Sequence, residues 1–483
     1  RGVMQWGSGS LVQDSWRDTL GLLWRIAVAA ILTAFLIKPL NIMSLGDTQA
    51  ESAGIPVKKI RLLSLAVAAF LSAGVVGFVG MMGFVGLAAA TLVRQMGVRT
   101  LSMRLICSFI VGALLLMLTD NGLMLLKHYC GTDLPAGAVT ALVGAPLLLW
   151  LTAKAPPRPS FQTTSDISTA APHVPRLLRF LLLIAVAVSV LAFTVGRYDE
   201  TLRLTIDPEY FVFRYPRVLL AAATGTMLAL TGVILQRLTQ NPMAGPELLG
   251  ISSGTAFGAM SVVMLFGITS GSGWFWLTGI VSALVSLGLL MLFNRKNGFT
   301  PEKILLTGMA LAALADAAIR IWMATGDFRV QLLLLWMSGS TYQATPESAL
   351  TVGLLAAASL LLILTLQRWL GLLSLNATIA RSVGINIPLA RLVLIVSSAA
   401  LTALSTLLIG PLSFVGLLAP HLARMLGARL PKQQLAAAAL IGASVMMTAD
   451  WLGRQVMFPY EVPAGMMATL IGGAYFMMMM RKL

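Results

Sequence analysis

The chain has 483 residues, of which 58% are hydrophobic and only 11% are charged, and its mean hydropathy is +0.87. These values lie far from those of soluble globular domains and exclude such a domain as the main body of the protein. The formal net charge of +16 would suit nucleic-acid binding, but the basic residues gather in alternate loops, which indicates membrane topology instead.

The first part of the chain contains five apolar stretches that approach the length of about 20 residues needed for a helix to cross a bilayer. They fall at residues 20–37, 60–80, 87–97, 102–124 and 136–152, and the third is short. A polar linker rich in Pro, Ser and Thr follows at residues 154–175.

Ten further apolar stretches follow the linker, and the segment 328–340 suits a helix that lies at the membrane interface. The ten fall at residues 178–196, 216–236, 248–268, 274–293, 303–324, 348–366, 390–410, 416–426, 434–454 and 464–480. The apolar runs are continuous, whereas a β-barrel would alternate polar and apolar residues in strands of about ten. The sequence therefore predicts an all-α polytopic membrane protein with about 15 spans.

The charged residues predict which loops face the cytoplasm. Lys and Arg favour one set of loops, with Lys58, Arg99 and Arg429 as examples, whereas Asp207 and Glu461 lie in the opposite set. The positive-inside rule places the basic set in the cytoplasm. The linker 154–175 then joins two cytoplasmic helix ends, so each copy of the repeat described next has an even number of spans. We therefore expect the two copies to lie parallel.

The chain repeats itself at a constant offset of 330 residues. Ser8-Gly9-Ser10 recurs as Ser338-Gly339-Ser340, and Phe84-Val85-Gly86-Leu87 recurs as Phe414-Val415-Gly416-Leu417. A register held over this length indicates a duplication, which transporters use to build two halves around a pathway. We expect residues 1–153 to be the C-terminal part of a first repeat that lacks roughly 150 or more residues, and 176–483 to be a complete second repeat.

A polar segment recurs in both copies on the predicted cytoplasmic side, at residues 43–57 and 373–388. Each contains Ala-x-x-x-Gly, as Ala50 to Gly54 and as Ala380-Arg381 to Gly384. This spacing suits a short helix, a tight turn and a second short helix that could fit a groove on a partner. Two copies on one face suggest a twofold cytosolic partner; the alternative is an ordinary amphipathic loop.

The chain resembles the permeases of the vitamin B12 and iron-siderophore ABC importers, called type II importers. The motifs that carry the resemblance are RYPR from Arg214, NPMAGPELLGISSG from Asn241, GPLSFVGLLAPHLAR from Gly410, ADWLGR from Ala449 and EVPAG from Glu461. The resemblance implies two repeats of about ten helices each, and it makes the segments around Ala50–Gly54 and Ala380–Gly384 the coupling helices that dock on the ATPase. A fused pair looks most like the members that import ferric hydroxamate siderophores.

Three arginines lie where spans meet the predicted periplasm. Arg214 and Arg217 stand at the start of a span and Arg454 ends another. We expect exposed guanidiniums there, because Arg pairs bidentately with carboxylates of a docking protein. The resemblance implies such contacts with a binding protein; the alternative is that these residues only snorkel to the interface.

Four residues are candidates for the gate and the pathway. Pro242 ends a span, and carbonyls freed at membrane depth are tolerated where they line a cavity, so Asn241 and Met243 are gate candidates on the resemblance. Asp316 and Arg320 stand four residues apart inside one span, where an ion pair lowers the cost of burial. A plain helix-breaking turn and a structural ion pair are the respective alternatives.

The sequence lacks a phosphate-binding G-x-x-x-x-G-K-[ST] loop, so we do not expect the chain to hydrolyse ATP, and it is predicted to be a transport subunit rather than an enzyme. We predict an inner-membrane permease that moves iron(III)-hydroxamate siderophores from periplasm to cytoplasm by alternating access. The alternatives are a proton- or sodium-coupled secondary transporter, a membrane enzyme, or an ABC permease for vitamin B12 or haem.

The partners implied by the resemblance are a dimer of cytosolic ABC ATPases, which would bind ATP and Mg, and a periplasmic siderophore-binding protein. No cofactor or metal is expected in this chain itself, because His128, His173 and His421 are scattered and do not form a ligand set.

Overall fold

The computed structural model describes residues 9, 11, 15–44, 46–80, 82–130, 134–154, 174–198, 201–205, 207–268, 272–295, 300–324, 327–342, 344–375 and 377–480. The chain divides into two compact units. The first comprises Arg1–Lys154 with Asp316–Asp327, and the second comprises Ala155–Ala315 with Phe328–Leu483. The division after residue 154 coincides with the start of the polar linker, but the predicted domain boundaries stay a prediction.

The first unit is built from long apolar helices joined by short turns. It contains α2 (Trp16–Met43), α3 (Asp47–Ser52), α4 (Val57–Val79), α5 (Val85–Gln95), α6 (Leu101–Cys130) and α7 (Ala136–Lys154). Helix α2 packs against α4, and α5 packs against α6 and α7. Ala29, Leu36 and Val67 form a buried cluster between α2 and α4.

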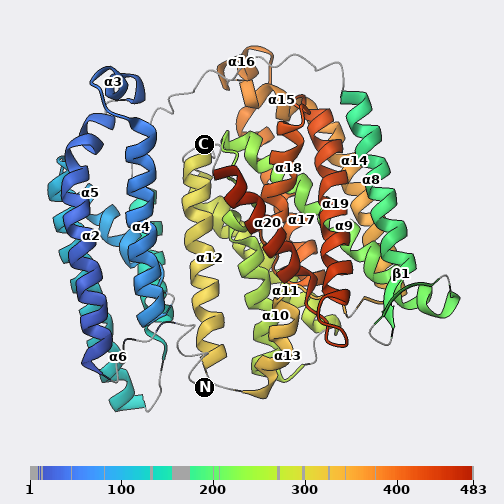
Figure 1. Cartoon of the computed structure of the whole chain (residues 1–483), viewed down its shortest axis with the longest axis horizontal. Coiled ribbons are helices and arrows are strands. Elements are labelled where there is room, and N and C mark those ends of the chain that lie inside the picture. The colour runs from blue at the N-terminus through green and yellow to red at the C-terminus, as the bar shows by residue number, and fades with distance from the viewer. Residues whose placement is uncertain are drawn as a thin grey trace. The chain divides into compact units, whose positions relative to one another are not determined.

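The second unit begins with α8 (Val174–Thr194) and an antiparallel hairpin of β1 (Val195–Tyr198) and β2 (Thr201–Leu204). It continues with α9 (Pro208–Thr239), the 3-10 helix η1 (Pro246–Leu249), α10 (Ile251–Phe266), α11 (Gly273–Asn294), the part of α12 (Pro301–Ala324) before Asp316, α13 (Phe328–Met337), α14 (Pro346–Thr365), α15 (Gln367–Leu375), α16 (Ala377–Ser382), α17 (Ile387–Ile409), α18 (Val415–Met425), α19 (Pro431–Gln455) and α20 (Ala464–Met480). The rest of α12 belongs to the first unit. Within this unit, β1 lies at the opposite end from α15 and α16 (Figure 1).

Helix α9 forms the centre of the second unit, because it packs against α14, α17, α18 and α19. Two glycines allow two of these contacts to be close. A Cβ added at Gly225 would lie 2.2 Å from the carbonyl oxygen of Gly442, and one added at Gly232 would lie 1.7 Å from that of Gly416. Only glycine therefore fits at either position, and both pairs fix how α9 crosses α19 and α18.

The predicted all-α fold is confirmed. Ten helices in the described residues are long and apolar enough to cross a membrane, and three more, at Ala136–Trp150, Ile251–Phe266 and Ala464–Met478, are shorter. The two stretches predicted to be short are α5 and α18, with 11 residues each. The segment predicted to lie at the interface contains α13, although its depth in the membrane stays a prediction, as does the parallel arrangement of the repeats.

The duplication is also present in the backbone. Residues with positive φ recur at the offset of 330, as Gly9 and Gly339, Gly54 and Gly384, Gly80 and Gly410, Gly97 and Gly427, and Phe84 and Phe414. The last pair is unusual, because a left-handed conformation is costly for an L-residue with a side chain. The two φ values are 69° and 71°, so both copies build the same strained turn before α5 and α18.

Candidate functional site

The segments predicted to couple to an ATPase form the same turn in both units. Ala50 in α3 is fully buried, Gly54 has φ +80°, and Ile55 donates its N–H to the carbonyl of Ala50 at 3.0 Å. Gly54 also donates to the carbonyl of Glu51 at 3.0 Å. These two bonds are the Schellman arrangement that ends a helix on a left-handed glycine.

The second copy repeats these contacts. Ala380 is fully buried, Gly384 has φ +84°, and the bonds from Gly384 to Arg381 and from Ile385 to Ala380 are both 3.0 Å long. The prediction of a second short helix after each glycine is wrong. The chain enters the long helices α4 and α17 directly, because the turn ends within two residues of Gly54 and Gly384.

The tips of both turns are exposed. Arg381, Ser382 and Gly384 are exposed in the second copy, and residues 51–54 are exposed in the first. A Cβ added at Gly54 or Gly384 would meet no atom within 4 Å. Glycine is therefore needed there for its backbone conformation and not for space.

Sequence reasoning missed a linkage between the second coupling segment and the central helix. Arg237, in the last turn of α9, directs Nη1 toward Ser374 Oγ at 3.5 Å, and Gln240 Nε2 donates to the Ser374 carbonyl at 2.6 Å. Arg237 Nε also donates to Gln434 Oε1 at 2.6 Å, and its Nη2 donates to the carbonyl of Arg429. The end of α9 is thus bonded to α15, to the connection before α19 and to the first turn of α19.

The predicted gate residues follow this linkage directly. Gln240 takes a left-handed conformation with φ 52° and ends α9 one residue before Asn241. Asn241 Oδ1 accepts from the N–H of Met243 at 2.9 Å, and the Asn241 carbonyl accepts from Ala244 at 3.1 Å. The helix therefore ends through Gln240 and an Asx turn, and the role of Asn241 and Met243 as a gate stays a prediction.

Glu247, in η1 a few residues further, is a second feature that the sequence did not reveal. Its Oε2 is buried and, among the described residues, has no hydrogen-bond partner. Burial raises the pKa of the Glu247 carboxyl above its ordinary value of 4.5. Gly245 makes room for this group, since a Cβ there would lie 2.4 Å from Glu247 Oε1.

The three arginines predicted to be exposed are largely buried, so that part of the prediction is wrong. Arg214 and Arg454 are each 9% exposed. Arg214 Nη1 donates to the carbonyl of Phe193 at 2.7 Å, and Arg454 Nη2 approaches that of Ala192 at 3.4 Å. They cover carbonyls that the end of α8 leaves without a helical partner.

The third arginine joins a network of charges at the same end of the unit. Arg217 forms a bidentate pair with Glu461, at 2.9 and 3.0 Å. Its Nε lies 3.6 Å from Asp450 Oδ1, while Arg454 Nη2 lies 3.0 Å from Asp450 Oδ2. Thr341 Oγ1 also donates to Asp450. Asp450 is fully buried, whereas the side chain of Glu461 is 39% exposed and that of Arg217 is 15% exposed. Glu461 is therefore the most accessible charged group of this network.

The predicted pathway pair lies on α12, where Asp316 is exposed and Arg320 is half-buried, one turn apart. Their role in the pathway stays a prediction.

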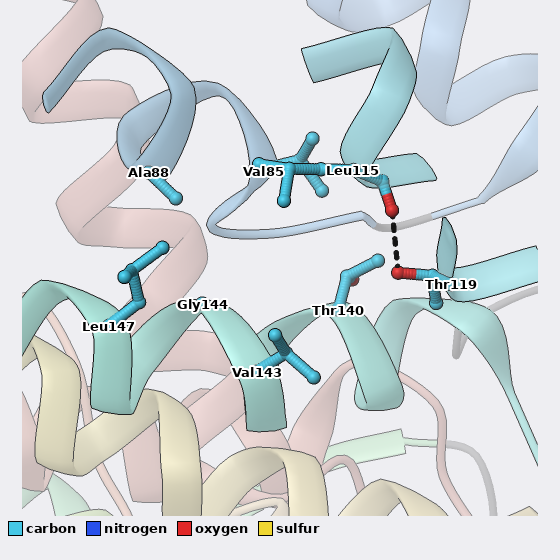
Figure 2. A pocket seen from close by; sticks show the side chains of 8 residues that line it. All are labelled: Val85, Ala88, Leu115, Thr119, Thr140, Val143, Gly144 and Leu147. Atoms are coloured by element: carbon cyan, nitrogen blue, oxygen red, sulfur yellow. Dashed lines mark hydrogen bonds between the residues drawn. The ribbon is translucent and has the colours of Figure 1, made fainter. Parts of the chain in front are cut away.

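The first unit contains a small cavity of about 20 Å³ between α5, α6 and α7 (Figure 2). Its hydroxyl groups, on Thr119 and Thr140, donate to carbonyls of their own helices. Such a cavity holds about one water and is far too small for a metal chelate.

The comparisons with known proteins agree with one another. The pattern of the FecCD transport family matches residues 1–154 and 177–482. The iron(3+)-hydroxamate import system permease protein FhuB of Escherichia coli is 39% identical over 99% of this chain and 73% of its own length. The hemin transport system permease protein HmuU of Yersinia pestis is 33% identical over 63% of this chain and 95% of its own length.

A solved structure is also similar. It is a chain assigned to the metal-chelate type of ABC transporter, in an inward-facing conformation, and it superposes with a TM-score of 0.58 at 29% identity. The match covers 64% of this chain and all of that chain. The resemblance to type II importer permeases is thereby confirmed, and the protein is a multi-pass protein of the inner membrane. On this evidence the chain belongs to the FecCD transport family.

Proposed function

We propose that the chain is the transmembrane permease subunit of an ABC importer and moves iron(III)-hydroxamate chelates from periplasm to cytoplasm. The substrate class rests on the similarity to the iron(3+)-hydroxamate permease, which extends over 99% of the chain. The energy comes from ATP hydrolysed by a partner, and this chain supplies the pathway and the surfaces that transmit the movement.

The observation that carries the proposal is the exposed Schellman turn that occurs twice, at Gly54 and at Gly384. Both turns place a buried alanine behind an exposed tip, with the same pair of hydrogen bonds. Two equal docking elements suit a dimer of ATPase subunits, because each subunit presents one equivalent surface.

Movement of the docked ATPases reaches the pathway through the linkage at the end of α9. Ser374 precedes the second coupling turn, and its contacts with Arg237 and Gln240 lead directly to Asn241 and Met243. Alternating access requires that the nucleotide-bound ATPase has different affinities for the two conformations of the permease. Asp316 and Arg320 are our candidates for residues that face the chelate.

The opposite end of the second unit carries the proposed contact with a periplasmic binding protein. Arg217 and Glu461 form an ion pair there that is partly open to solvent. A carboxylate of the docking protein would compete with Glu461 for the Arg217 guanidinium. Arg214 and Arg454 would act indirectly in this arrangement, by holding the end of α8 in place.

The test is ATP-dependent uptake of iron-labelled ferrichrome into proteoliposomes that contain the full-length permease, its ATPase and the binding protein. In the double variant Gly54→Pro and Gly384→Pro, proline cannot adopt the φ of either turn. We expect uptake to be lost while the protein remains folded. The matched control is Gly54→Asn with Gly384→Asn, which should keep most of the activity because Asn tolerates a left-handed conformation.

Each result has a distinct meaning. Uptake that requires ATP and disappears only in the proline variant supports the proposal. Uptake without ATPase would instead support a secondary transporter driven by protons or sodium. If hydrolysis is stimulated by the permease but ferrichrome does not move, the importer class stands and the substrate is a different chelate.

A further inference from the structure

The two coupling turns have the same backbone and the same buried contacts. Glu51 and Arg381 occupy the same place in each turn, because the carbonyl of each accepts the N–H of the turn glycine at 3.0 Å. Val57 and Ile387, which begin the helices after the turns, are each 4% exposed. The two segments therefore offer a partner the same shape.

The tip of the turn carries a negative charge in the first copy and a positive charge in the second. Glu51 and Arg381 are separated by the repeat offset of 330 residues, and both residues are exposed. The other carboxylate of α3, on Asp47, is paired with Arg61, whose Nη2 lies 2.9 and 3.1 Å from its two oxygens. Glu51 is therefore the acidic group that the first turn presents to a partner.

The second copy shows how exposed the tip is when the helices that precede it in the repeat are present. Helices α8 to α15 all come before this turn, and Arg381 and Ser382 are exposed nonetheless. Helix α16 packs on α15 and α17, its neighbours in the chain, just as α3 packs on α2 and α4. The turn is thus held by adjacent helices of its own copy, and its tip is left for a partner.

The charges around the turns indicate the chemistry of that partner. The predicted cytoplasmic ends of both units carry exposed basic residues, among them Lys58, Lys59, Arg424 and Arg429. A protein that docks on a basic face presents acidic groups, because complementary charges hold such a complex together and like charges oppose it. Arg381 has the sign that this partner favours, whereas the carboxylate of the first turn has the opposite sign.

A dimer of identical subunits presents the same groove to both turns, because its twofold symmetry makes the two docking surfaces equal. We propose that each groove holds an acidic group at the place where the tip of the turn enters. Arg381 then attracts this group and strengthens the docking of one ATPase subunit, while Glu51 repels it and weakens the docking of the other. This docking rests on the proposed function, since it takes the partner to be a dimer of ATPases.

Binding of the purified ATPase to the full-length permease in nanodiscs is the test. We expect Arg381→Gln to weaken binding and Glu51→Gln to strengthen it, each by up to roughly fivefold, as an exposed charge pair implies. The reversed charges of Arg381→Glu and Glu51→Arg should enlarge these changes in the same directions. All four changes should shrink at high salt, because exposed charges are screened. The control Arg179→Gln, which removes an exposed basic residue on α8, should leave the affinity unchanged.

A photo-crosslinking amino acid placed at Ser52 or at Ser382 reports on each turn separately. Both serines are exposed, and each follows the charged residue of its turn. When the ATPase is limiting, the ratio of cross-linked product at Ser382 to that at Ser52 should fall in the double variant Glu51→Arg with Arg381→Glu. Because this exchange keeps the total charge of the two tips, the overall affinity should stay close to that of the wild type.

The outcomes separate this docking from the proposed function. Changes in the same direction at both turns, or an affinity and a cross-linking ratio that do not change, would overturn the proposal while the importer class stands, since the ATPase still binds. Binding strengthened by Arg381→Gln and weakened by Glu51→Gln would place a basic group in the groove and would also overturn it. A wild-type permease that does not bind the ATPase would overturn the proposed function itself, and the unequal docking with it.

Discussion

Asp450 and Arg454 lie one helical turn apart on α19, and Asp450 Oδ2 is 3.0 Å from Arg454 Nη2. The same carboxylate faces Arg217 Nε at 3.6 Å through its other oxygen, which also accepts from Thr341. One fully buried carboxylate therefore balances two guanidiniums that are themselves mostly buried. A buried charge left without its partner is strongly destabilising, which makes Asp450 the most sensitive member of the network.

We expect Asp450→Ala to lower the free energy of unfolding by about 3–5 kcal/mol, because it leaves two guanidiniums without their shared carboxylate. Thermal unfolding in detergent measures the loss. Asp120 occupies the equivalent position in the first copy, is half-buried, and has Met124 where the second copy has Arg454. Asp120→Ala should therefore cost only about 1 kcal/mol. Equal losses in the two variants would contradict the role assigned to the network.

Gly232→Ala is expected to prevent the close approach of α9 and α18, because the new methyl group would lie 1.7 Å from the Gly416 carbonyl oxygen. Overpacking against a backbone atom cannot be relieved by a rotamer change, so the loss should be about 3 kcal/mol or more. Gly288→Ala on α11 is the matched control, since a Cβ there meets no atom within 4 Å. It should stabilise its helix by about 0.5–1 kcal/mol. The Tm values of both variants in detergent test the pair of expectations.

The fold could be predicted in outline because membrane helices are specified by local composition. Every apolar stretch found in the sequence corresponds to a helix, including the short ones that became α5 and α18. The offset of 330 also predicted the equivalent turns at Gly54 and Gly384, since a left-handed backbone requires glycine whatever the tertiary contacts are.

The candidate site could be predicted only in part, because burial depends on tertiary contacts. The sequence predicts Arg214 and Arg454 to be exposed at helix ends. In the structure the end of α8 packs against them, and their guanidiniums donate to the carbonyls of Phe193 and Ala192. The Arg237–Ser374 contact joins residues 137 positions apart, and no local pattern could reveal it. Glu247 lies within a quoted motif, yet nothing in the motif indicates that its carboxyl is buried.

Arg237→Met is expected to separate ATP hydrolysis from transport. Methionine fills a similar volume but removes the donors that reach Ser374, Gln434 and the Arg429 carbonyl. The loss of hydrogen bonds from a charged donor suggests a fall of about tenfold or more in chelate transported per ATP hydrolysed, with hydrolysis largely retained. Uptake and phosphate release measured on the same proteoliposomes give this ratio.

Arg179→Met serves as the control for the loss of a basic residue on the predicted cytoplasmic side. Arg179 is exposed and contacts only a carbonyl of its own helix among the described residues, at 3.4 Å. Its substitution should leave the ratio of transport to hydrolysis unchanged. A parallel fall of uptake and hydrolysis in Arg237→Met would indicate poor assembly with the ATPase, and Arg237 would then have no separate role in coupling.

Glu247→Gln should remove part of the pH dependence of stability. Burial raises the pKa of Glu247 in the folded protein, so the folded state binds the proton more tightly than the unfolded chain does. The free energy of unfolding is therefore least affected below the ordinary value of 4.5 and decreases as the pH rises through the folded-state pKa. Glutamine stays neutral at every pH and avoids this decrease. The Tm of the wild type should thus fall progressively below that of Glu247→Gln as the pH rises above 4.5. A difference that does not change with pH would show that the carboxyl is hydrated and ionised in the folded protein.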